Sequence, residues 1–264
     1  MNKKKWLLIG ALTKIPLLIY LVITISTVPA ITAIDNETIL GAHRGDSQLY
    51  MENTQEAIMS ALNDEKYKFI EFDIQYTKDK EIVVYHDSSL SRLQSKTESI
   101  IDLTYDELQA ISDFSIPKYE DIIHTIGDTK KVNIEIKSSG NEELDIELTD
   151  FVIKDLKDRG LLHNVMISSP KGYVIKHITD NCPEVKTGKV YWIMFSTYIN
   201  YDFVTENLYE EAEELGADYI LIHGANIQNI ESLKDLKPEG VTLCIWYFTN
   251  EVHIVQVDES DQLW

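Results

Sequence analysis

Eight short apolar runs, most of them separated by stretches of helical periodicity, constrain the fold of this chain more than any other feature. The runs have the length of strands and are apolar on both faces. Helical stretches such as 54–63, 143–159 and 203–215 lie between them. The runs cover residues 38–43, 69–76, 82–86, 132–137, 164–168, 185–190, 218–223 and 241–248. Strands that alternate with helices predict a parallel sheet covered by helices.

Length and charge narrow this prediction. The chain has 264 residues, of which 44% are hydrophobic, enough for one large domain and within the range of an α/β barrel. It carries 44 acidic and 24 basic side chains, a formal net charge of −20. Nucleic acid is therefore not an expected partner, because binding a phosphate backbone depends on lysine and arginine. Cys182 and Cys244 are too few for a disulfide framework or a zinc cluster, and both are interpreted as free thiols.

The connection between the second and third runs departs from the alternation. Only residues 77–80 separate the two runs, and so short a loop predicts an antiparallel hairpin. With the turn centred on the middle two of these residues, His86 lies opposite Glu71 and Val84 lies opposite Asp73. Paired residues point to the same face, so His86 is expected beside the two carboxylates. A shift of one residue in the pairing would remove this arrangement.

Three carboxylates lie inside apolar strands. Glu71 and Asp73 are two residues apart and share one face of their strand, and Glu135 shares a face with Asn133 and Lys137 in the fourth run. The alternative is that each is a solvated residue or half of an ion pair, but an unpaired charge inside an apolar strand costs several kcal/mol. Three oxygen ligands without cysteine suit Ca²⁺ or Mg²⁺ better than zinc.

Two of the seven histidines stand out. His43 and His86 each end an apolar strand and are followed at once by a polar partner, Arg44 or Asp87. This is the position of site residues at the C-terminal mouth of a barrel. Two histidines near a metal can serve as acid and base, since imidazole works in either protonation state. We interpret four others, in helical or loop contexts, as incidental: His124, His163, His177 and His253.

The first 37 residues form a separate segment. Lysines at 3–5 precede an apolar stretch that is broken only by Lys14, and residues 15–34 have about the length that spans a hydrocarbon core. We predict a membrane-anchoring transmembrane helix, with residues 38–264 as the catalytic domain outside the cell membrane. The alternative is a signal peptide cleaved after residues 31–33, which would leave a secreted protein.

Several motifs resemble those of the glycerophosphodiester phosphodiesterases in order and spacing. They are GAHRGD, MENT, IEFDIQYTKDKEIVVYHDSSLSR, IDLTYDEL, IPKYEDII and NIEIKSSG. The resemblance covers residues from about 39 to 250. It implies an α/β TIM (β/α)8-type barrel with a small insertion after the second strand, at about 77–117. The pattern of the family's last strand is absent, so we expect a barrel that lacks the last strand and helix.

The resemblance also assigns roles to residues of this chain. Arg44 and Lys137 would form a phosphate clamp, and Glu52 and Asn53 would support the site. Where the family has a W-T-V-N motif, this chain has CIWYFTN, so either Trp246 or Tyr247 would contact the substrate. By the same resemblance, Glu71, Asp73 and Glu135 would bind the metal, and His43 and His86 would act as general base and acid.

These roles imply metal-dependent hydrolysis of a glycerophosphodiester to glycerol 3-phosphate and an alcohol. Deacylated phospholipids and polyglycerolphosphate polymers are the expected substrates. One alternative is a phospholipase D-like lyase that acts on intact lipids. Another is an inactive, truncated surface protein that only binds a metal or a polymer. Seven parallel strands would leave the edges of 38–43 and 241–248 unpaired, and residues 252–257 are apolar enough to pair with such an edge.

Overall fold

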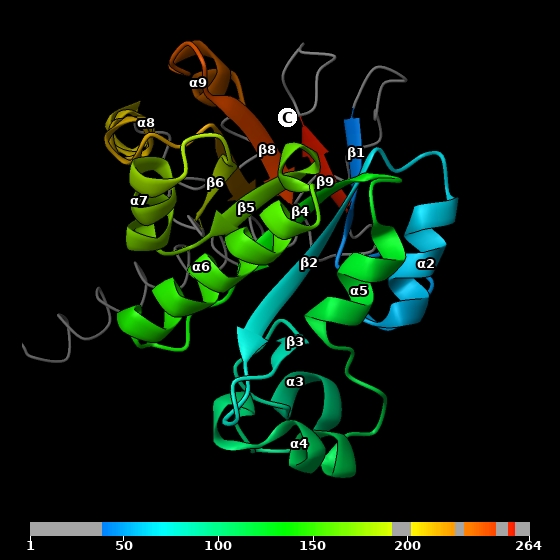
Figure 1. The fold of residues 1–264 in the computed structure, drawn as a ribbon. Coiled ribbons are helices and arrows are strands. Elements are labelled where there is room, and N and C mark those ends of the chain that lie inside the picture. Colours follow the sequence, from blue (N-terminus) through cyan, green and yellow to red (C-terminus); the bar gives the residue numbers. More distant parts are fainter. Residues whose placement is uncertain (1–38, 192–201, 225–229, 247–252, 257–264) are drawn as a thin grey trace, which may run out of the picture.

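The computed structural model describes residues 39–191, 202–224, 230–246 and 253–256. Seven parallel strands form the curved central sheet, and helices cover its outside (Figure 1). The strands are β1 (Ile39–His43), β2 (Phe69–Tyr76), β4 (Lys131–Ile136), β5 (Val165–Ser169), β6 (Lys186–Tyr191), β7 (Tyr219–His223) and β8 (Thr242–Trp246). The prediction of an α/β barrel is therefore confirmed, with strand bounds within two residues of those expected wherever both ends are described.

An eighth strand joins the two ends of this sheet. β9 (His253–Gln256) pairs antiparallel with β8 and also with β1, while β1 pairs with β2 on its other side. The expectation that the edges of β1 and β8 stay unpaired is thus wrong. The expectation that residues 252–257 could pair with an edge is confirmed. The ring closes with a reversed strand instead of an eighth parallel one, because only six residues, 247–252, separate β8 from β9, too few for the crossover that a parallel strand needs.

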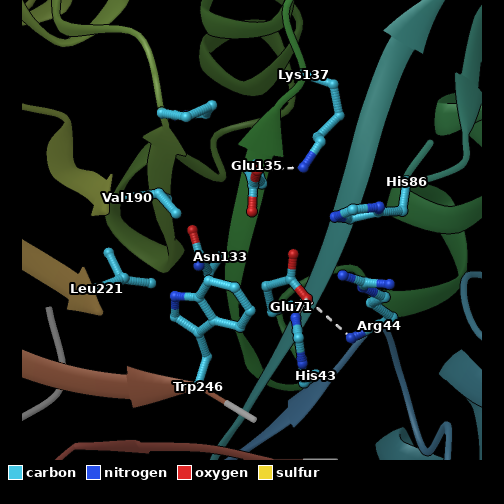
Figure 2. Close-up of a pocket in the computed structure, with 11 residues that line it drawn as sticks. His43, Arg44, Glu71, His86, Asn133, Glu135, Lys137, Val190, Leu221 and Trp246 are labelled. Carbon is cyan, nitrogen blue, oxygen red and sulfur yellow. Dashed lines mark hydrogen bonds and ion pairs between the residues drawn. The ribbon is translucent and has the colours of Figure 1, made fainter. Parts of the chain in front are cut away.

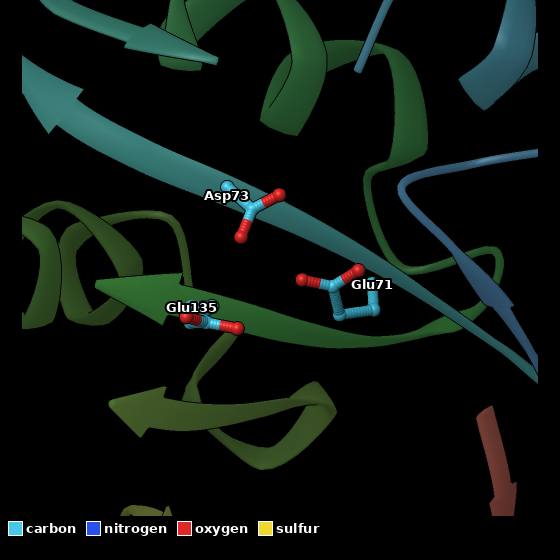
Figure 3. A group of neighbouring side chains, drawn as sticks. All are labelled: Glu71, Asp73 and Glu135. Carbon is cyan, nitrogen blue, oxygen red and sulfur yellow. The ribbon is translucent and has the colours of Figure 1, made fainter. Parts of the chain in front are cut away.

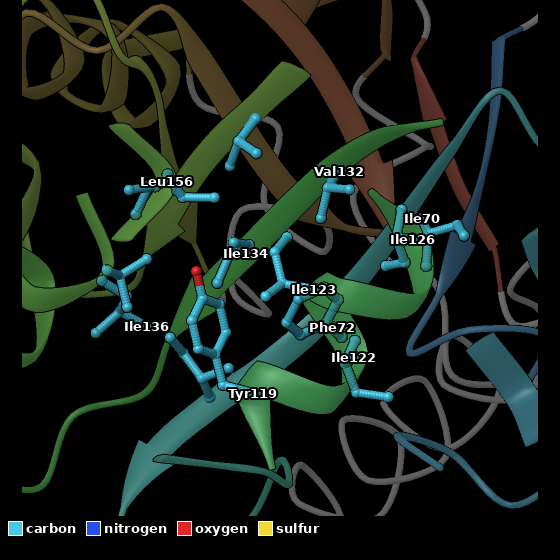
Figure 4. Packing of buried hydrophobic residues seen from close by; sticks show 14 of the residues in the cluster. Ile70, Phe72, Tyr119, Ile122, Ile123, Ile126, Val132, Ile134, Ile136 and Leu156 are labelled. Atoms are coloured by element: carbon cyan, nitrogen blue, oxygen red, sulfur yellow. The ribbon is translucent and has the colours of Figure 1, made fainter. Parts of the chain in front are cut away.

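The main core lies between the sheet and the helices. Outward-facing Ile70, Phe72 and Ile134 pack with Tyr119 and Ile123 in a cluster of fully buried side chains (Figure 4). These outward residues alternate along each strand with inward ones, as the period of a strand requires. The surrounding helices are α2 (Gln55–Asn63), α5 (Tyr119–Ile126), α6 (Glu142–Asp158), α7 (Gly172–Asn181), α8 (Asp202–Leu215) and α9 (Ile230–Asp235), with a 3-10 turn η2 (Leu162–Asn164) before β5.

The interior of the barrel is plugged below the site. Phe69, Met166, Tyr219, Leu221 and Cys244 form a second apolar cluster with Trp246. These side chains come from alternate positions of several strands, as expected for a packed barrel interior. The site above them can therefore open only toward the C-terminal ends of the strands. Both cysteines are free, as predicted, and both are buried.

The hairpin after β2 forms, but in a different register from the predicted one. β3 (Ile82–Val84) pairs antiparallel with β2, and Ile74 lies opposite Val84, one residue away from the predicted pairing. The reason is the turn: Lys80 has a positive φ of 61°, and Thr77 pairs with Glu81 across a three-residue loop, whereas the prediction assumed a two-residue turn. If β3 continued in this register, His86 would point away from Glu71. Because β3 ends at Val84, the register does not determine the direction of His86.

The insertion forms a small lobe beside the end of β2 (Figure 1). It contains α3 (Ser91–Gln94), the 3-10 turn η1 (Ile100–Asp102) and α4 (Tyr105–Ile111). The lobe has an apolar cluster of its own, built around Tyr85, Leu90 and Leu108. This is the insertion predicted at about 77–117. It fixes the chain on both sides of His86.

The predicted anchor at residues 1–37 lies outside the described residues, as does Tyr247. Among the helices that the structure describes, none combines the length and the hydropathy needed to cross a bilayer. The division into residues 1–37 and 38–264 therefore stays a prediction.

The close contact between Gly41 and Phe69 gives a first test of the fold. A Cβ at Gly41 would lie 2.2 Å from the Phe69 ring, which is only 1% exposed. We expect Gly41→Ala to lower the free energy of unfolding by ~1–3 kcal/mol, the usual cost of overpacking, measured by urea denaturation. Adding Phe69→Leu should recover part of the loss. Equal stability of Gly41→Ala and the wild type would contradict this packing.

Candidate active site

A pocket opens at the C-terminal ends of the parallel strands, and its two halves differ in character (Figure 2). One half is polar and is lined by His43, Arg44, Glu71, His86, Glu135 and Lys137. The other half is apolar and is lined by Pro170, Val190, Leu221 and Trp246. Asn133 lies between the two halves. The structure thus brings together residues from six strands and from the loops that follow strands.

The three predicted carboxylates form one group (Figure 3). Asp73 and Glu135 are direct neighbours in the β2–β4 ladder, and Glu71 lies two residues before Asp73 on the same face. One oxygen from each of the three lies within 4.8 Å of the others, and all three side chains are buried. Such a cluster of buried carboxylate oxygens matches the ligand set of a hard divalent cation.

Burial and neighbouring charges shift the pKa values of two of these carboxylates, Glu71 and Asp73. Burial, followed by the charges of Asp73 and Glu135, raises the pKa of Glu71 well above its usual range. Burial would also raise the pKa of Asp73, but neighbouring charges, led by His86 and Lys137, hold it below its usual range. Glu71 Oε1 is buried and has no hydrogen-bond partner among the described residues. An oxygen in this state, aimed at two other carboxylates, fits a cation ligand.

Two cationic side chains border the carboxylates. Arg44 is 1% exposed, and its backbone N–H donates to Glu71 Oε2 at 2.8 Å while its Nε lies 3.4 Å from Asp73 Oδ2. Lys137 Nζ lies 2.6 Å from Glu135 Oε1 and 3.5 Å from Asp73 Oδ1. Burial opposes the charge of Lys137, but Glu135 and Asp73 raise its pKa. Lys137 therefore stays charged beside the carboxylates, where an anionic group can meet it and the Arg44 guanidinium.

His43 lies against the carboxylates from the β1 side. In the β1–β2 ladder it is the direct neighbour of Glu71, and its Nε2 lies 3.8 Å from Glu71 Oε2. The Trp246 ring packs on it at a centroid distance of 5.8 Å. The Ser47 hydroxyl donates to its backbone carbonyl at 2.7 Å. These contacts hold the imidazole at the wall of the pocket.

His86 reaches the pocket from the opposite side by a route that the predicted register did not include. Gln75, on the inward face of β2, donates from Nε2 to the carbonyls of Tyr85 and Asp87 at 2.7 and 2.9 Å. These two bonds fix the backbone on both sides of His86. The side chain of Asp87 then lies 2.8 Å from His86 Nδ1. Arg92, from the insertion, donates to the other oxygen of Asp87 at 2.6 Å.

Glu52 and Asn53, which the resemblance predicts to support the site, contact Arg44 and Asp73. Glu52 accepts from Arg44 at 2.7 Å and from two nitrogens of Arg92. Burial opposes ionisation of Glu52, but the hydrogen bonds and charges of Arg92 and Arg44 lower its pKa. Asn53 donates from Nδ2 to Asp73 Oδ2 at 2.8 Å, and its Oδ1 accepts from the Asp73 backbone N–H at 3.2 Å.

The structure adds two residues to the predicted site. Trp246 lines the pocket, and because Tyr247 lies outside the described residues, the choice between these two for substrate contact stays a prediction. His223 ends β7 and packs edge-on against Trp246 at 4.7 Å, and burial lowers its pKa. Its position at the end of an apolar strand, which also marks His43, could have singled it out. Asn133 was expected only to share a face with Glu135, and its place in the pocket lining is new.

Fold and site together define a class: an α/β-barrel enzyme whose mouth combines a carboxylate cluster, two fixed cations and two histidines. The chain matches the sequence model of the glycerophosphoryl diester phosphodiesterase family over residues 43–261. It therefore belongs to this family and is an enzyme of that class.

Individual relatives agree with this assignment. A glycerophosphodiester phosphodiesterase of Caldanaerobacter subterraneus is 32% identical over 166 residues, which cover 59% of this chain and 67% of the relative. Human lysophospholipase D GDPD3 is 28% identical over 61% of this chain and 54% of its own length. The chain thus spans two thirds of the first relative and about half of the second.

Solved structures share the fold. The glycerophosphodiester phosphodiesterase of Thermotoga maritima has a TM-score of 0.61 and 26% identity, over 80% of this chain and 86% of that one. An Oleispira antarctica phosphodiesterase, solved with its product sn-glycerol-3-phosphate, has a TM-score of 0.60 and 23% identity over 79% and 83% of the two chains.

Proposed function

We propose that this enzyme hydrolyses glycerophosphodiesters to glycerol 3-phosphate and an alcohol, with a divalent cation, Ca²⁺ or Mg²⁺, held by Glu71, Asp73 and Glu135. The observation that carries this proposal is the buried carboxylate group flanked by Arg44 and Lys137. When bound, the cation would withdraw charge from the phosphoryl oxygens. The two cationic side chains would bind the same oxygens from either side and orient the phosphate between the histidines.

The histidines then move the protons. One removes the proton of the glycerol hydroxyl next to the ester, and that oxygen attacks phosphorus to give a glycerol cyclic phosphate. The bond from phosphorus to the leaving alcohol breaks, and the other histidine supplies the proton that this alcohol takes up. Water then opens the cyclic phosphate to glycerol 3-phosphate. With the Nδ1 proton of His86 donated to Asp87, its Nε2 is left to exchange a proton with the substrate.

A lysophospholipid is a second candidate substrate, favoured by the apolar side of the site. Val190, Leu221 and Trp246 offer an apolar wall inside the pocket. Three apolar residues on the loop between β1 and α2 are exposed: Leu49 at 72%, Tyr50 at 47% and Met51 at 43% of their surface. An acyl chain leaving the pocket would find apolar surface there. The relative named lysophospholipase D supports testing this substrate.

An assay of the products formed from four substrates distinguishes the proposed hydrolase from the alternatives. The purified chain is incubated with glycerophosphocholine, glycerophosphoglycerol, lysophosphatidylcholine and phosphatidylcholine, with Ca²⁺, with Mg²⁺ and with a chelator. We expect glycerol 3-phosphate from the deacylated substrates, and its loss with chelator. Release of cyclic phosphates from intact lipid would favour a phospholipase D-like lyase. No turnover, with cation binding intact, would favour a protein that only binds a metal or a polymer.

We also propose that residues 1–37 anchor the enzyme in the cell membrane with the catalytic domain outside. The proposal depends on the apolar stretch after the lysines at 3–5. The measurement is the distribution of the full chain between membrane and aqueous fractions, and deletion of residues 1–37 is the control. A full chain that stays uncleaved in the aqueous fraction would exclude the anchor, and cleavage after residues 31–33 would indicate a secreted protein.

A further inference from the structure

Asn133 lies on the floor of the pocket between its polar and apolar halves (Figure 2). It is the direct neighbour of Glu71 in the β2–β4 ladder and of Met166 in the β4–β5 ladder, and it precedes Glu135 by two residues. Its side chain therefore points into the barrel. It is only 1% exposed, and because it precedes Glu135 on β4, it lies farther from the C-terminal ends of the strands.

Both polar atoms of the Asn133 side chain are unpaired. Neither Oδ1 nor Nδ2 has a hydrogen-bond partner among the described residues, and both are shielded from solvent. A buried amide in this state costs ~1–3 kcal/mol unless a ligand or a water completes it. Beneath it, Phe69 and Met166 belong to the apolar plug and offer no partner of that kind. The described residues thus leave both atoms open to a partner that enters through the pocket.

The chemistry of this partner follows from the amide. Asn133 offers an acceptor and two donors without charge, which suits a hydroxyl group, since a hydroxyl both donates and accepts. The anionic part of a substrate belongs to Arg44 and Lys137 on the polar side. The pocket volume of about 210 Å³ is below the range of roughly 300–1,000 Å³ usual for drug-sized ligands, so the fragment bound here is small.

We propose that Asn133 binds the free hydroxyl at C1 of the glycerol and selects substrates that carry it. This inference rests on the proposed function, in which C3 carries the phosphate and the C2 hydroxyl attacks, so that C1 bears the one hydroxyl left to recognise. Leu221 and Trp246 pack beside the glycerol carbons. A substrate acylated at C1 cannot donate from that oxygen and adds bulk at the floor, so deacylated diesters are preferred over lysophospholipids.

The test pairs one change in the substrate with one change in the protein. Glycerophosphocholine is compared with its 1-deoxy analogue, propane-1,2-diol phosphocholine, which keeps the attacking hydroxyl. In the wild type, kcat/KM should be ~10–100-fold lower for the analogue, because the buried amide loses its partner. In Asn133→Leu the two substrates should differ by no more than about twofold, the size of an absent coupling. Asn133→Ala, which adds no volume, should give the same loss of discrimination.

Ser168 provides a matched control. It is fully buried on the inward face of β5, and its Oγ has no hydrogen-bond partner among the described residues, but it does not line the pocket. Ser168→Ala should keep the discrimination of the wild type. Thermal denaturation should show Asn133→Leu at least as stable as the wild type, because it removes an unpaired buried amide.

Three outcomes would overturn the inference. The first is a wild type that does not distinguish the two substrates, and the second is an Asn133→Leu variant that still does. The third is loss of Ca²⁺ or Mg²⁺ binding by Asn133→Leu in calorimetry, which would make Asn133 a cation ligand. A wild type that releases neither glycerol 3-phosphate from glycerophosphocholine nor propane-1,2-diol phosphate from the analogue overturns the proposed function itself, and the inference with it.

Discussion

Glu71→Gln is expected to abolish turnover while leaving the metal-free protein at least as stable as the wild type. Glu71 is buried beside Asp73 and Glu135, and these surroundings raise its pKa, so a neutral amide is tolerated better than a carboxylate without a cation. The same change removes one of three anionic ligands. We expect kcat to fall by ~10³-fold or more, since a bound metal contributes several kcal/mol to transition-state stabilisation.

Thermal denaturation with and without the cation measures both effects. At a concentration of 100 Kd, the cation should stabilise the wild type by ~2.7 kcal/mol, and Glu71→Gln should lose most of this gain. Asp46→Asn is the control, because Asp46 is an equally buried carboxylate that accepts from Ser60 and Tyr67 outside the group. A Glu71→Gln protein with the full cation response would exclude Glu71 as a ligand.

The pH dependence of the metal-free protein has a definite sign. The folded-state pKa of Glu71 is raised, so between the unfolded value of ~4.3 and that higher value the folded state binds more protons than the unfolded state. The contribution of Glu71 to the free energy of unfolding is therefore complete at acid pH and is lost as pH rises through the folded pKa. Glu71→Gln should flatten this dependence in urea denaturation measured across pH.

The second large effect concerns the two histidines. His43→Ala and His86→Ala should each lower kcat by ~10²–10⁴-fold, the usual range for losing a positioned acid or base. Neither imidazole is one of the proposed cation ligands, so the cation-induced rise in melting temperature should remain. His177→Gln is the control, because His177 pairs with Asp150 on the surface, away from the pocket. Loss of the cation response in His43→Ala or His86→Ala would instead make that histidine a ligand.

The features of the site that could be predicted from the sequence depend on residues close together in the chain. Glu71 and Asp73 share a face because side chains alternate along any strand, and this needs no knowledge of the fold. Their proximity to Glu135 follows once β4 pairs with β2, the next parallel strand. The position of His86 was harder, because it depends on the turn: a left-handed Lys80 lengthens the loop by one residue, and no glycine marks that position in the sequence.

Other features depend on the assembled fold, and no short sequence motif predicts them. The role of Asn133 depends on a missing hydrogen-bond partner, which appears only when β2, β4 and β5 are assembled around it. The reversed direction of β9 likewise depends on two strand edges that are distant in sequence. The place of Trp246 in the pocket lining is simpler, because Trp246 follows Cys244 on the inward face of β8.

The pairing of β9 with β1 has a consequence for how the protein is made. Ile39 pairs with Gln256, the contact with the greatest sequence separation in the ladders of the described strands. β1, whose last residue is His43, therefore acquires one of its two neighbours only after residues 253–256 have been synthesised. Contacts of such long range form slowly and leave strand edges exposed while they are unmade. A nascent chain thus presents the edge of β1 until synthesis reaches β9, so stalled or prematurely ended chains are the form most exposed to aggregation.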